Sequence, residues 1–303
     1  MPILTIIIPT AGRRSGLPDL VRSLQGQRLF RDRAEIVLVD DALSPGSYLD
    51  LDVRVVRTPG GRGPAYARNR GVDASGGGHL LFLDDDVSVA QDYAPKVLDL
   101  VELDVAAAGG PAYPAQEPST AIERYLDAMG FLQQPVRNSE GDILCVPSVQ
   151  LLVKKTLFEQ SGGFDEQFPY PGGEDNDLFL RLRHLGASIA FERDLSVRHD
   201  NRMGLVTFAR RFFRYGVGTR LACVKHGLAP NYAGFRMSAR TEIFRDTPGL
   251  LRAIVHDPWS RAPSGRPVDS ALFAGLSCVR LLAYEMGGLA ALSRVKSRDA
   301  RAA

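Results

Sequence analysis

The sequence predicts an α/β fold, with a mostly parallel, Rossmann-like central sheet flanked by helices and a helical C-terminal extension. Two apolar runs, residues 36–39 and 80–83, have the length of strands buried on both faces, and each leads directly into aspartates. Over the first hundred residues, predicted strands alternate with stretches of helical spacing. This alternation is typical of a parallel sheet with right-handed crossovers.

The first part of the chain supplies four predicted strands and two predicted helices. Apolar, β-branched residues indicate the first strand, and apolar residues at helical spacing, such as Leu17, Leu20 and Leu24, indicate the first helix. A turn rich in glycine and proline, residues 59–64, opens the second helix. In chain order we expect strand 3–8, helix 17–29, strand 36–39, strand 53–56, helix 65–70 closed by Gly71, and strand 80–83.

The rest of the chain is less regular. Residues 112–142 are rich in polar residues and proline, so we expect a variable loop region with a helical piece near 122–129. The other expected elements are helix 93–103, strand 105–108, strand 148–153, helix 156–161, a helix from 178 that ends at Gly186, strand 195–199, helices within 204–215, 242–256 and 269–293, and a frayed tail at 294–301.

Composition narrows the function classes. The chain has 303 residues, 45% apolar and 24% charged, as in soluble globular proteins, and its net charge of +2 gives no case for nucleic-acid binding. Three widely spaced cysteines fit a reducing compartment, and the N-terminus lacks the features of a signal peptide. No uncharged apolar run reaches 18 residues, so no membrane-spanning helix is expected. We therefore expect a cytoplasmic protein, with a place at the inner face of the membrane left open.

The aspartates after residue 83 are the strongest functional signal. Three adjacent carboxylates cannot be buried with the strand, so they lie at its carboxyl end, where open α/β sheets bind ligands. Asp84 and Asp86 point to one side and Asp85 to the other. Paired carboxylates suit Mg²⁺ or Mn²⁺, and these ions suit a diphosphate. The alternative is a solvated acidic turn.

Two further groups of polar residues extend this site. Glu174, Asp175 and Asp177 crowd the start of a helix after two glycines. Capping of the helix dipole would need only one acid, so three favour a functional role. His199 follows a predicted strand, and structural and metal-binding roles both remain open for it.

The basic residues are concentrated in the second half of the chain. A helix over 204–215 places Arg210 and Arg214 on one face, where phosphate is a natural partner and a solvated face is the alternative. The apolar stretch 270–292 contains Arg280 and Glu285. It fits packing on the main domain better than contact with a membrane surface.

Five motifs, in this order, resemble the glycosyltransferases of family 2, which have the GT-A fold. They are Thr-Ile-Ile-Ile-Pro-Thr at 5–10, Val-Asp-Asp-Ala at 39–42, Ala-Arg-Asn-Arg-Gly at 67–71, Phe-Leu-Asp-Asp-Asp at 82–86 and Gly-Glu-Asp-Asn-Asp-Leu at 173–178. The resemblance implies a catalytic domain over residues 1–205, with a nucleotide-sugar half (1–110) and an acceptor half (111–205). Residues 206–303 form the helical extension.

The resemblance also assigns roles to individual residues. It implies a nucleotide-sugar donor, most simply a UDP-sugar, and Mn²⁺ or Mg²⁺. Pro9 and Thr10 would line the nucleoside site, Asp40 or Asp41 would accept a hydrogen bond from the base, and Arg68 or Arg70 would hold the nucleotide. Asp84 and its neighbour Asp85 would lie near the donor, Asp86 and His199 would bind the metal, and Arg214 would reach the diphosphate. Asp175, beside Glu174, would be the general base of an inverting transfer.

Two other function classes are compatible with these motifs. A nucleotidyltransferase would also use two aspartates and a metal, but residues 60–63 lack the Gly-Lys-Ser/Thr ending of a phosphate loop. A non-catalytic binding subunit could keep the fold, although the full set of acids argues against it. The acceptor is open: we expect a glycan or a lipid-linked glycan, and a small molecule or a peptide also fits.

Overall fold

The computed structural model describes residues 2–228, 261 and 267–302, apart from positions 13, 45, 47, 49, 139 and 169. The chain forms two compact units. Unit 1 comprises Met1–Ala115, Leu132–Pro169 and Asp177–Asp200, and unit 2 comprises Gln116–Phe131, Tyr170–Asn176 and Asn201–Ala303. The predicted helix over 242–256 lies outside the described residues.

Unit 1 is built on a seven-stranded sheet with the order β11-β6-β10-β4-β1-β2-β3. The strands are β1 (Leu4–Thr10), β2 (Ala34–Asp40), β3 (Arg54–Arg57), β4 (His79–Leu83), β6 (Ala107–Gly109), β10 (Gln150–Lys154) and β11 (Ile189–Phe191). β10 is antiparallel to β4 and β6, and the other pairs are parallel. The predicted mostly parallel sheet is therefore confirmed.

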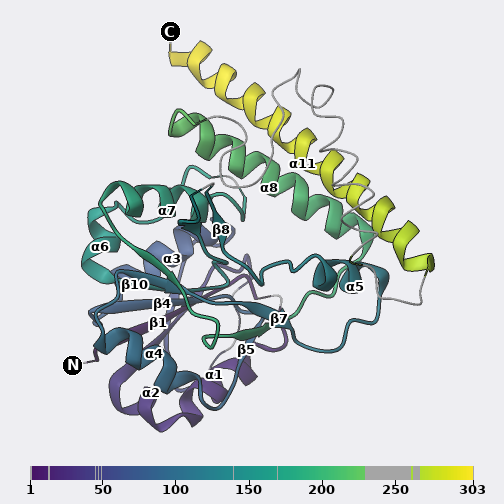
Figure 1. Cartoon of the computed structure of the whole chain (residues 1–303). Coiled ribbons are helices and arrows are strands. Elements are labelled where there is room, and N and C mark those ends of the chain that lie inside the picture. Colours follow the sequence, from purple (N-terminus) through teal and green to yellow (C-terminus); the bar gives the residue numbers. More distant parts are fainter. Residues whose placement is uncertain are drawn as a thin grey trace. The chain divides into compact units, whose positions relative to one another are not determined.

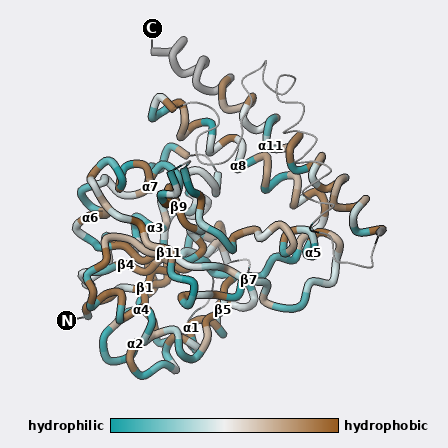
Figure 2. The backbone as a smooth tube through the Cα atoms, in the orientation of Figure 1, coloured by the Kyte–Doolittle hydropathy of each residue, from teal (hydrophilic) through white to brown (hydrophobic). Residues whose placement is uncertain are grey.

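Successive side chains of the strands point to opposite faces of the sheet, so there are two apolar cores, one on each face. Ile6 and Ile8 of β1 pack with α1 (Leu17–Gly26), α2 (Arg28–Arg33) and α4 (Tyr93–Glu102). Ile7 faces the other way and packs with α3 (Pro64–Asp73), α6 (Lys155–Gln160) and α7 (Glu174–His184). Figure 1 shows these two groups of helices on opposite faces of the sheet, and Figure 2 shows the apolar strands between them.

Two helix predictions were wrong in detail. The helix expected over 17–29 is two helices, because Gln27 adopts extended backbone angles (φ −85°, ψ 111°) between them. Gly71 does not end the second helix, which continues to Asp73. A Cβ atom at Gly71 would lie 2.4 Å from Cγ2 of Ile7, so the glycine lets α3 pack closely on β1.

The region expected to be a variable loop contains regular structure. It forms β7 (Ala112–Pro114), α5 (Ala121–Ala128) and β8 (Val136–Arg137), and β8 pairs with β9 (Ile143–Cys145). Thr120 begins α5 with a capping box: its side chain accepts from the Glu123 N–H, and the Glu123 carboxylate accepts from the Thr120 N–H. The expected helical piece is thus confirmed, and the other described residues of the region form short strands, turns and irregular backbone.

A second sheet of unit 1 has the order β5-β12-β7, with β5 at Val87–Val89 and β12 at Val197–His199. β12 runs antiparallel to β5, so that His199 lies opposite Val87. The Asp200 N–H extends this ladder and donates to the Asp86 carbonyl oxygen at 3.0 Å. The sheet thereby brings the end of β12 to the aspartates that follow β4.

In unit 2, α8 (Leu205–Lys225) and α11 (Pro267–Ala302) run side by side (Figure 1). Glycines permit this close approach: a Cβ at Gly216 would lie 1.9 Å from the Tyr284 carbonyl oxygen, and one at Gly287 would lie 2.0 Å from that of Phe213. α8 extends ten residues beyond the predicted 204–215 stretch, and the expected frayed tail continues α11.

Aromatic side chains form the core of unit 2. Tyr125 of α5 packs edge-on against Phe208 of α8 and Phe273 of α11, and its hydroxyl group lies 2.8 Å from that of Ser277. Arg124 and Asp269 form a two-bonded ion pair at 2.8 and 3.1 Å, and the Asp269 side chain is buried. Three helices from distant parts of the sequence are thus joined.

One helix within the described residues is a candidate for crossing a membrane by length and composition alone, and the search for an uncharged apolar run did not find it. Residues Val268–Leu292 of α11 are long enough and apolar enough, although only a third of the apolar window is buried. The prediction of a membrane-spanning helix required an uncharged apolar run of 18 residues. Arg280 and Glu285 interrupt this segment, so it did not meet that requirement. The large apolar side chains that α11 exposes are Val268, Leu272, Leu282, Met286 and Leu289. Figure 2 shows the apolar stretches along this helix.

Candidate functional site

The three aspartates after β4 have three different sets of partners. Asp84 accepts a hydrogen bond from Nη2 of Arg68 at 2.8 Å, and its backbone N–H donates to the carbonyl oxygen of Val149. Arg68 projects from α3 and its side chain is only 5% exposed. Burial raises the pKa of Asp84, and the nearby Arg68 guanidinium opposes this rise. Arg68, one of the two arginines predicted to hold the nucleotide, therefore contacts the acidic cluster formed by Asp84, Asp85 and Asp86.

Asp85 is held by the end of β1. Its Oδ2 accepts a hydrogen bond from Oγ1 of Thr10 at 2.6 Å, and the same Oγ1 accepts from the Gly12 N–H at 3.0 Å. Burial raises the pKa of Asp85 to about 6, although the Thr10 hydrogen bond works in the opposite direction. Thr10 and Asp85, which the sequence analysis placed in one donor site, are therefore direct neighbours.

Asp86 lies between a histidine and an arginine. Its Oδ1 is 3.3 Å from Nε2 of His199, and its Oδ2 is 2.7 Å from Nη2 of Arg14. The Asp86 and His199 side chains are 11% and 5% exposed, whereas that of Arg14 is 37% exposed. The predicted metal pair is thus brought together. Arg14 was not among the predicted site residues, although its position in the turn after the first strand pointed to the same sheet edge.

The Asp86–His199 pair fits a divalent cation. A carboxylate oxygen and an imidazole nitrogen 3.3 Å apart can both bind one Mn²⁺ or Mg²⁺ ion. Within the described residues, no group of three or more His, Cys, Asp or Glu side chains could hold a metal ion. The pair therefore suits an ion that completes its ligand set with substrate phosphates and water, as Mg²⁺ commonly does.

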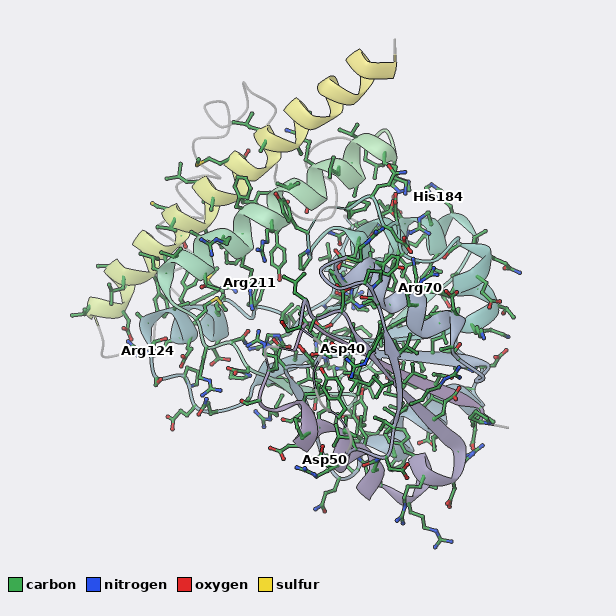
Figure 3. All side chains as sticks on the ribbon, turned by 180° about the vertical axis from the view of Figure 1, so that it is seen from behind. Asp40, Asp50, Arg70, Arg124, His184 and Arg211 are labelled. Carbon is green, nitrogen blue, oxygen red and sulfur yellow. The ribbon has the colours of Figure 1, made fainter. Side chains whose placement is uncertain are left out.

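Asp40 binds the turn that follows β2. Its carboxylate accepts hydrogen bonds from the N–H groups of Ala42 and Gly46, both at 3.1 Å, and from Nη1 of Arg57 at 2.6 Å. Its side chain is 1% exposed. Figure 3 labels Asp40. The main partners of this aspartate are therefore its own turn and Arg57, which the sequence analysis did not single out.

Asp41 binds the glycine-rich turn that precedes α3. Its carboxylate accepts from the Arg62 N–H at 3.1 Å, from the Gly63 N–H at 2.8 Å and from the Thr58 hydroxyl group. A phosphate loop would direct such N–H groups at a nucleotide, whereas here two of them bind a carboxylate. This arrangement does not favour the triphosphate-binding alternative.

The other predicted donor-site residues of unit 1 lie on β1 and α3. Pro9 is half-buried opposite Val39 of β2. Arg70 pairs with Asp73 at 2.9 Å, and its guanidinium lies 5.1 Å from the centre of the Tyr66 ring. Figure 3 labels Arg70. Of the two arginines proposed for the nucleotide, Arg68 contacts the acidic cluster, and the contacts of Arg70 given by the structure are with its own helix and Glu166.

The acids at the start of α7 differ in burial. Glu174 is 3% exposed, and its Oε2 accepts from the Gly172 N–H at 2.6 Å. Asp177 is fully buried and accepts two hydrogen bonds from Arg181, one turn further along the helix. Asp175 accepts from the N–H groups of Gly173 and Asn176, and its side chain is partly exposed. Of these three acids, Asp175 is therefore the one with a partly exposed side chain, whereas the buried Asp177 pairs with Arg181 of its own helix.

Arg214 belongs to α8 in unit 2. Its guanidinium lies 5.7 Å from the centre of the Tyr170 ring, and its side chain is half-buried. Arg211, labelled in Figure 3, lies 5.9 Å from the ring centre of Phe131, while Arg210 is exposed. The basic stretch therefore stacks on aromatic rings of its own unit.

Comparison with known proteins gives a family match. Residues 5–162 match the model of glycosyl transferase family 2. The pre-mycofactocin glycosyltransferase of Mycobacterium tuberculosis is 31% identical over 235 residues, which cover 74% of this chain and 48% of that protein. This chain therefore spans about half the length of the curated relatives it matches first. The matched family region includes Asp84–Asp86 but ends before Glu174, Asp175 and His199.

Two further proteins extend the comparison over most of the chain. The succinoglycan biosynthesis protein ExoM of Rhizobium meliloti is 28% identical over 273 residues, covering 80% of this chain and 87% of that protein. The solved mannosyltransferase PcManGT from Pyrobaculum calidifontis, in complex with GDP-Man and Mn²⁺, has a TM-score of 0.59 at 17% identity. That alignment covers 95% of this chain and 87% of the mannosyltransferase, and it shows a shared fold.

Proposed function

Because the chain belongs to glycosyl transferase family 2, we propose that it transfers a sugar from a nucleoside diphosphate sugar to an acceptor hydroxyl group. The observation that carries this proposal is the Asp86–His199 pair at the end of β4, 3.3 Å apart and beside the Thr10–Asp85 and Arg68–Asp84 contacts. Carboxylate and imidazole ligands beside guanidinium groups suit a diphosphate leaving group and its cation.

The donor site is assigned to the carboxyl edge of the large sheet. Asp86 and His199 would hold Mn²⁺ or Mg²⁺, which neutralises charge on the departing diphosphate when it is bound. Pro9, Thr10 and the turns organised by Asp40 and Asp41 would form the nucleoside side of this site. The other residues proposed for the donor site are Arg68, Arg70, Asp84 and Asp85, and Arg214 of α8 stays a prediction from the sequence. The GDP-Man and Mn²⁺ bound by the mannosyltransferase of similar fold support a metal-dependent nucleotide sugar, although we expected UDP from the sequence.

Asp175 is proposed as the general base of an inverting transfer. A base of this kind takes the proton of the acceptor hydroxyl group as the oxygen atom attacks the anomeric carbon, and the carbon–oxygen bond to the diphosphate breaks on the opposite face. The partial exposure of Asp175 and its hydrogen bonds to the Gly173 and Asn176 N–H groups support this role. Glu174, which is buried and bonded to Gly172, would position the turn.

The acceptor is proposed to be a glycan or a lipid-linked glycan. The match to a succinoglycan biosynthesis protein over most of the chain supports a glycan. Exposed apolar side chains on α11 and the basic sequence at 294–301 support peripheral contact with a membrane, at its inner face if the compartment is the reducing one that the cysteines predict. Residues 1–110 would then serve the donor, and residues 111–205 the acceptor.

A nucleotide-binding panel tests the proposal. UDP, GDP, CDP and dTDP, with UTP and GTP for comparison, would be titrated with and without Mn²⁺. We expect one diphosphate to bind with a clear dependence on Mn²⁺, and Asp86→Ala and His199→Ala to lose that binding by at least about tenfold. Asp92→Ala, which removes an exposed aspartate paired with Lys96, should bind like the wild type.

The outcomes separate the function classes. Tighter binding and turnover of a triphosphate would favour a nucleotidyltransferase. Binding of a nucleotide sugar with no turnover, even with water as acceptor, would favour a non-catalytic subunit. Failure of a folded wild-type protein to bind any diphosphate would reject the proposed function.

A further inference from the structure

Arg14 lies in the turn between β1 and α1 and covers the aspartate assigned to the metal. Its Nη2 is 2.7 Å from Oδ2 of Asp86. The arginine side chain is 37% exposed, whereas that of Asp86 is 11% exposed. A partly exposed cation thus contacts a mostly buried carboxylate, at one oxygen atom of that carboxylate.

Thr10 and Gly12, which precede Arg14, lie beside the acidic cluster. Oγ1 of Thr10 accepts from the Gly12 N–H at 3.0 Å and donates to Asp85 at 2.6 Å. Gly12 has a φ of +70°, and a Cβ atom there would lie 3.0 Å from Cβ of Ala42. The hydroxyl group of Thr10 therefore contacts both Gly12 and Asp85.

The other oxygen atom of Asp86 faces the histidine. Oδ1 of Asp86 and Nε2 of His199 are 3.3 Å apart, so the carboxylate presents one oxygen to an imidazole and the other to a guanidinium. A divalent cation shared by Asp86 and His199 would add two positive charges next to Arg14 and repel it. A diphosphate offers Arg14 a better partner, because guanidinium binds phosphate oxygen atoms in a two-pronged fork.

We propose that Arg14 exchanges Asp86 for the donor diphosphate when the cation and the nucleotide bind. This inference rests on the proposed function and extends it to a residue that the family motifs did not identify. Arg14 neutralises Asp86 in the absence of a cation, so it weakens binding of the cation alone. It then contacts the phosphate groups, so it strengthens nucleotide binding in the presence of the cation. The two ligands are thereby coupled.

The test measures Mn²⁺ alone and then Mn²⁺ with nucleotide. Free Mn²⁺ would be followed by its electron paramagnetic resonance signal in wild type, Arg14→Gln, Arg14→Lys and Arg22→Gln. We expect Arg14→Gln to bind Mn²⁺ alone about threefold to tenfold more tightly, and to bind the diphosphate chosen by the panel about tenfold more weakly with Mn²⁺ present. Arg14→Lys keeps the charge, so it should resemble the wild type for Mn²⁺ alone and recover part of the nucleotide affinity.

Arg22→Gln is the control for this experiment, and two kinds of result would contradict the proposal for Arg14. Arg22 lies on α1 and pairs with Asp19 and Asp50, so Arg22→Gln should match the wild type in both titrations. Unchanged Mn²⁺ binding by Arg14→Gln, or weaker binding of Mn²⁺ alone, would overturn the exchange while leaving the proposed function in place. If the folded wild-type protein binds no diphosphate with Mn²⁺, both proposals fall together.

Discussion

Asp175 is the residue on which the proposed proton transfer depends. It is partly exposed, whereas Glu174 and Asp177 beside it are buried. We expect Asp175→Asn to lower kcat for nucleotide-sugar turnover by at least about 100-fold, because the amide cannot accept the acceptor's proton. Nucleotide affinity should remain within about twofold of the wild type. Glu159→Gln, an exposed acid on α6, serves as the matched control.

The two readouts also identify a wrong assignment. A loss of nucleotide affinity equal to the loss of turnover would place Asp175 in donor binding. Retained turnover would remove it from the mechanism altogether.

His79 makes the stability of unit 1 depend on pH. Its side chain is 8% exposed and its Nε2 lies 3.6 Å from Oδ1 of Asp104. Burial lowers the pKa of His79, which outweighs the opposite effect of Asp104, so the imidazole is neutral at pH 7. The unfolded chain therefore binds this proton more readily than the folded chain. Stability is lost as the pH falls through the unfolded pKa of about 6.5.

The pH effect can be measured by urea unfolding at pH 7.5 and 5.5. Between these values, wild type should lose up to about 1.4 kcal/mol more than His79→Gln, which cannot titrate. His184, labelled in Figure 3, is exposed on α7, and His184→Gln serves as the matched histidine substitution. Equal pH dependence in wild type and His79→Gln would contradict the neutral, buried state of His79.

At the scale of residues, the acids were predictable and their partners were not. A buried strand that ends in three aspartates must present them at the sheet edge, and Asp84–Asp86 lie there. Asp40 and Asp41 accept hydrogen bonds mainly from backbone N–H groups. Almost every residue supplies such a group, so no pattern of side chains in the sequence predicts these bonds. Arg14 belongs to none of the motifs, and only its place in the turn after the first strand indicated the same sheet edge.

At Gly71, the close packing of α3 on β1 requires glycine, although alanine has the higher intrinsic preference for a helix. Alanine is favoured over glycine inside helices by up to about 1 kcal/mol. A Cβ at Gly71, however, would lie 2.4 Å from Ile7 and 3.1 Å from Val39. We expect Gly71→Ala to reduce the free energy of unfolding by about 1–3 kcal/mol, measured by urea titration.

A matched glycine on another helix provides the control. Gly26 ends α1, and a Cβ there would have no atom within 4 Å, so Gly26→Ala should be neutral or slightly stabilising. Equal effects of the two substitutions would mean that α3 can move away from β1 at little cost.

At the scale of elements, the long strands and amphipathic helices were found because their periodicity is strong. β5, β7 and β11 have three residues each, too few to show a period, and all three were missed. The antiparallel direction of β10 could not be predicted either. Apolar residues alternate in the same way in a strand that runs parallel to its neighbours and in one that runs antiparallel to them. Gly71 was taken for a helix terminator because only its three-dimensional neighbours explain it.

For the molecule as a whole, α11 predicts membrane contact. Wild type should sediment with vesicles that contain anionic lipids, and more weakly as salt increases, because of the basic residues at 294–301. Replacing exposed Leu282 and Met286 by glutamine should reduce the bound fraction by about tenfold. The matched control replaces exposed Leu103 and Leu185 of unit 1. Equal binding by both double variants would exclude α11 as the contact.

The division into two units was only partly visible in the sequence. The change to helical, basic sequence after residue 200 marks most of unit 2. Residues 116–131 and 170–176 also belong to unit 2, and local patterns do not reveal this, since α5 joins it through the Arg124–Asp269 pair and the packing of Tyr125 on Phe273. Contacts over such sequence distances are decided by the tertiary fold.

The small sheet β5-β12-β7 has a consequence for how a growing chain acquires its site. β12 completes this sheet by pairing with two strands made much earlier, and it brings His199 to Asp86. Contacts between segments far apart in sequence form slowly, and ribosomes make the N-terminal segments first. A nascent chain therefore carries the aspartates that follow β4 before it has the imidazole that faces Asp86. The proposed metal site would therefore be completed only after β12 has been made and has paired with β5.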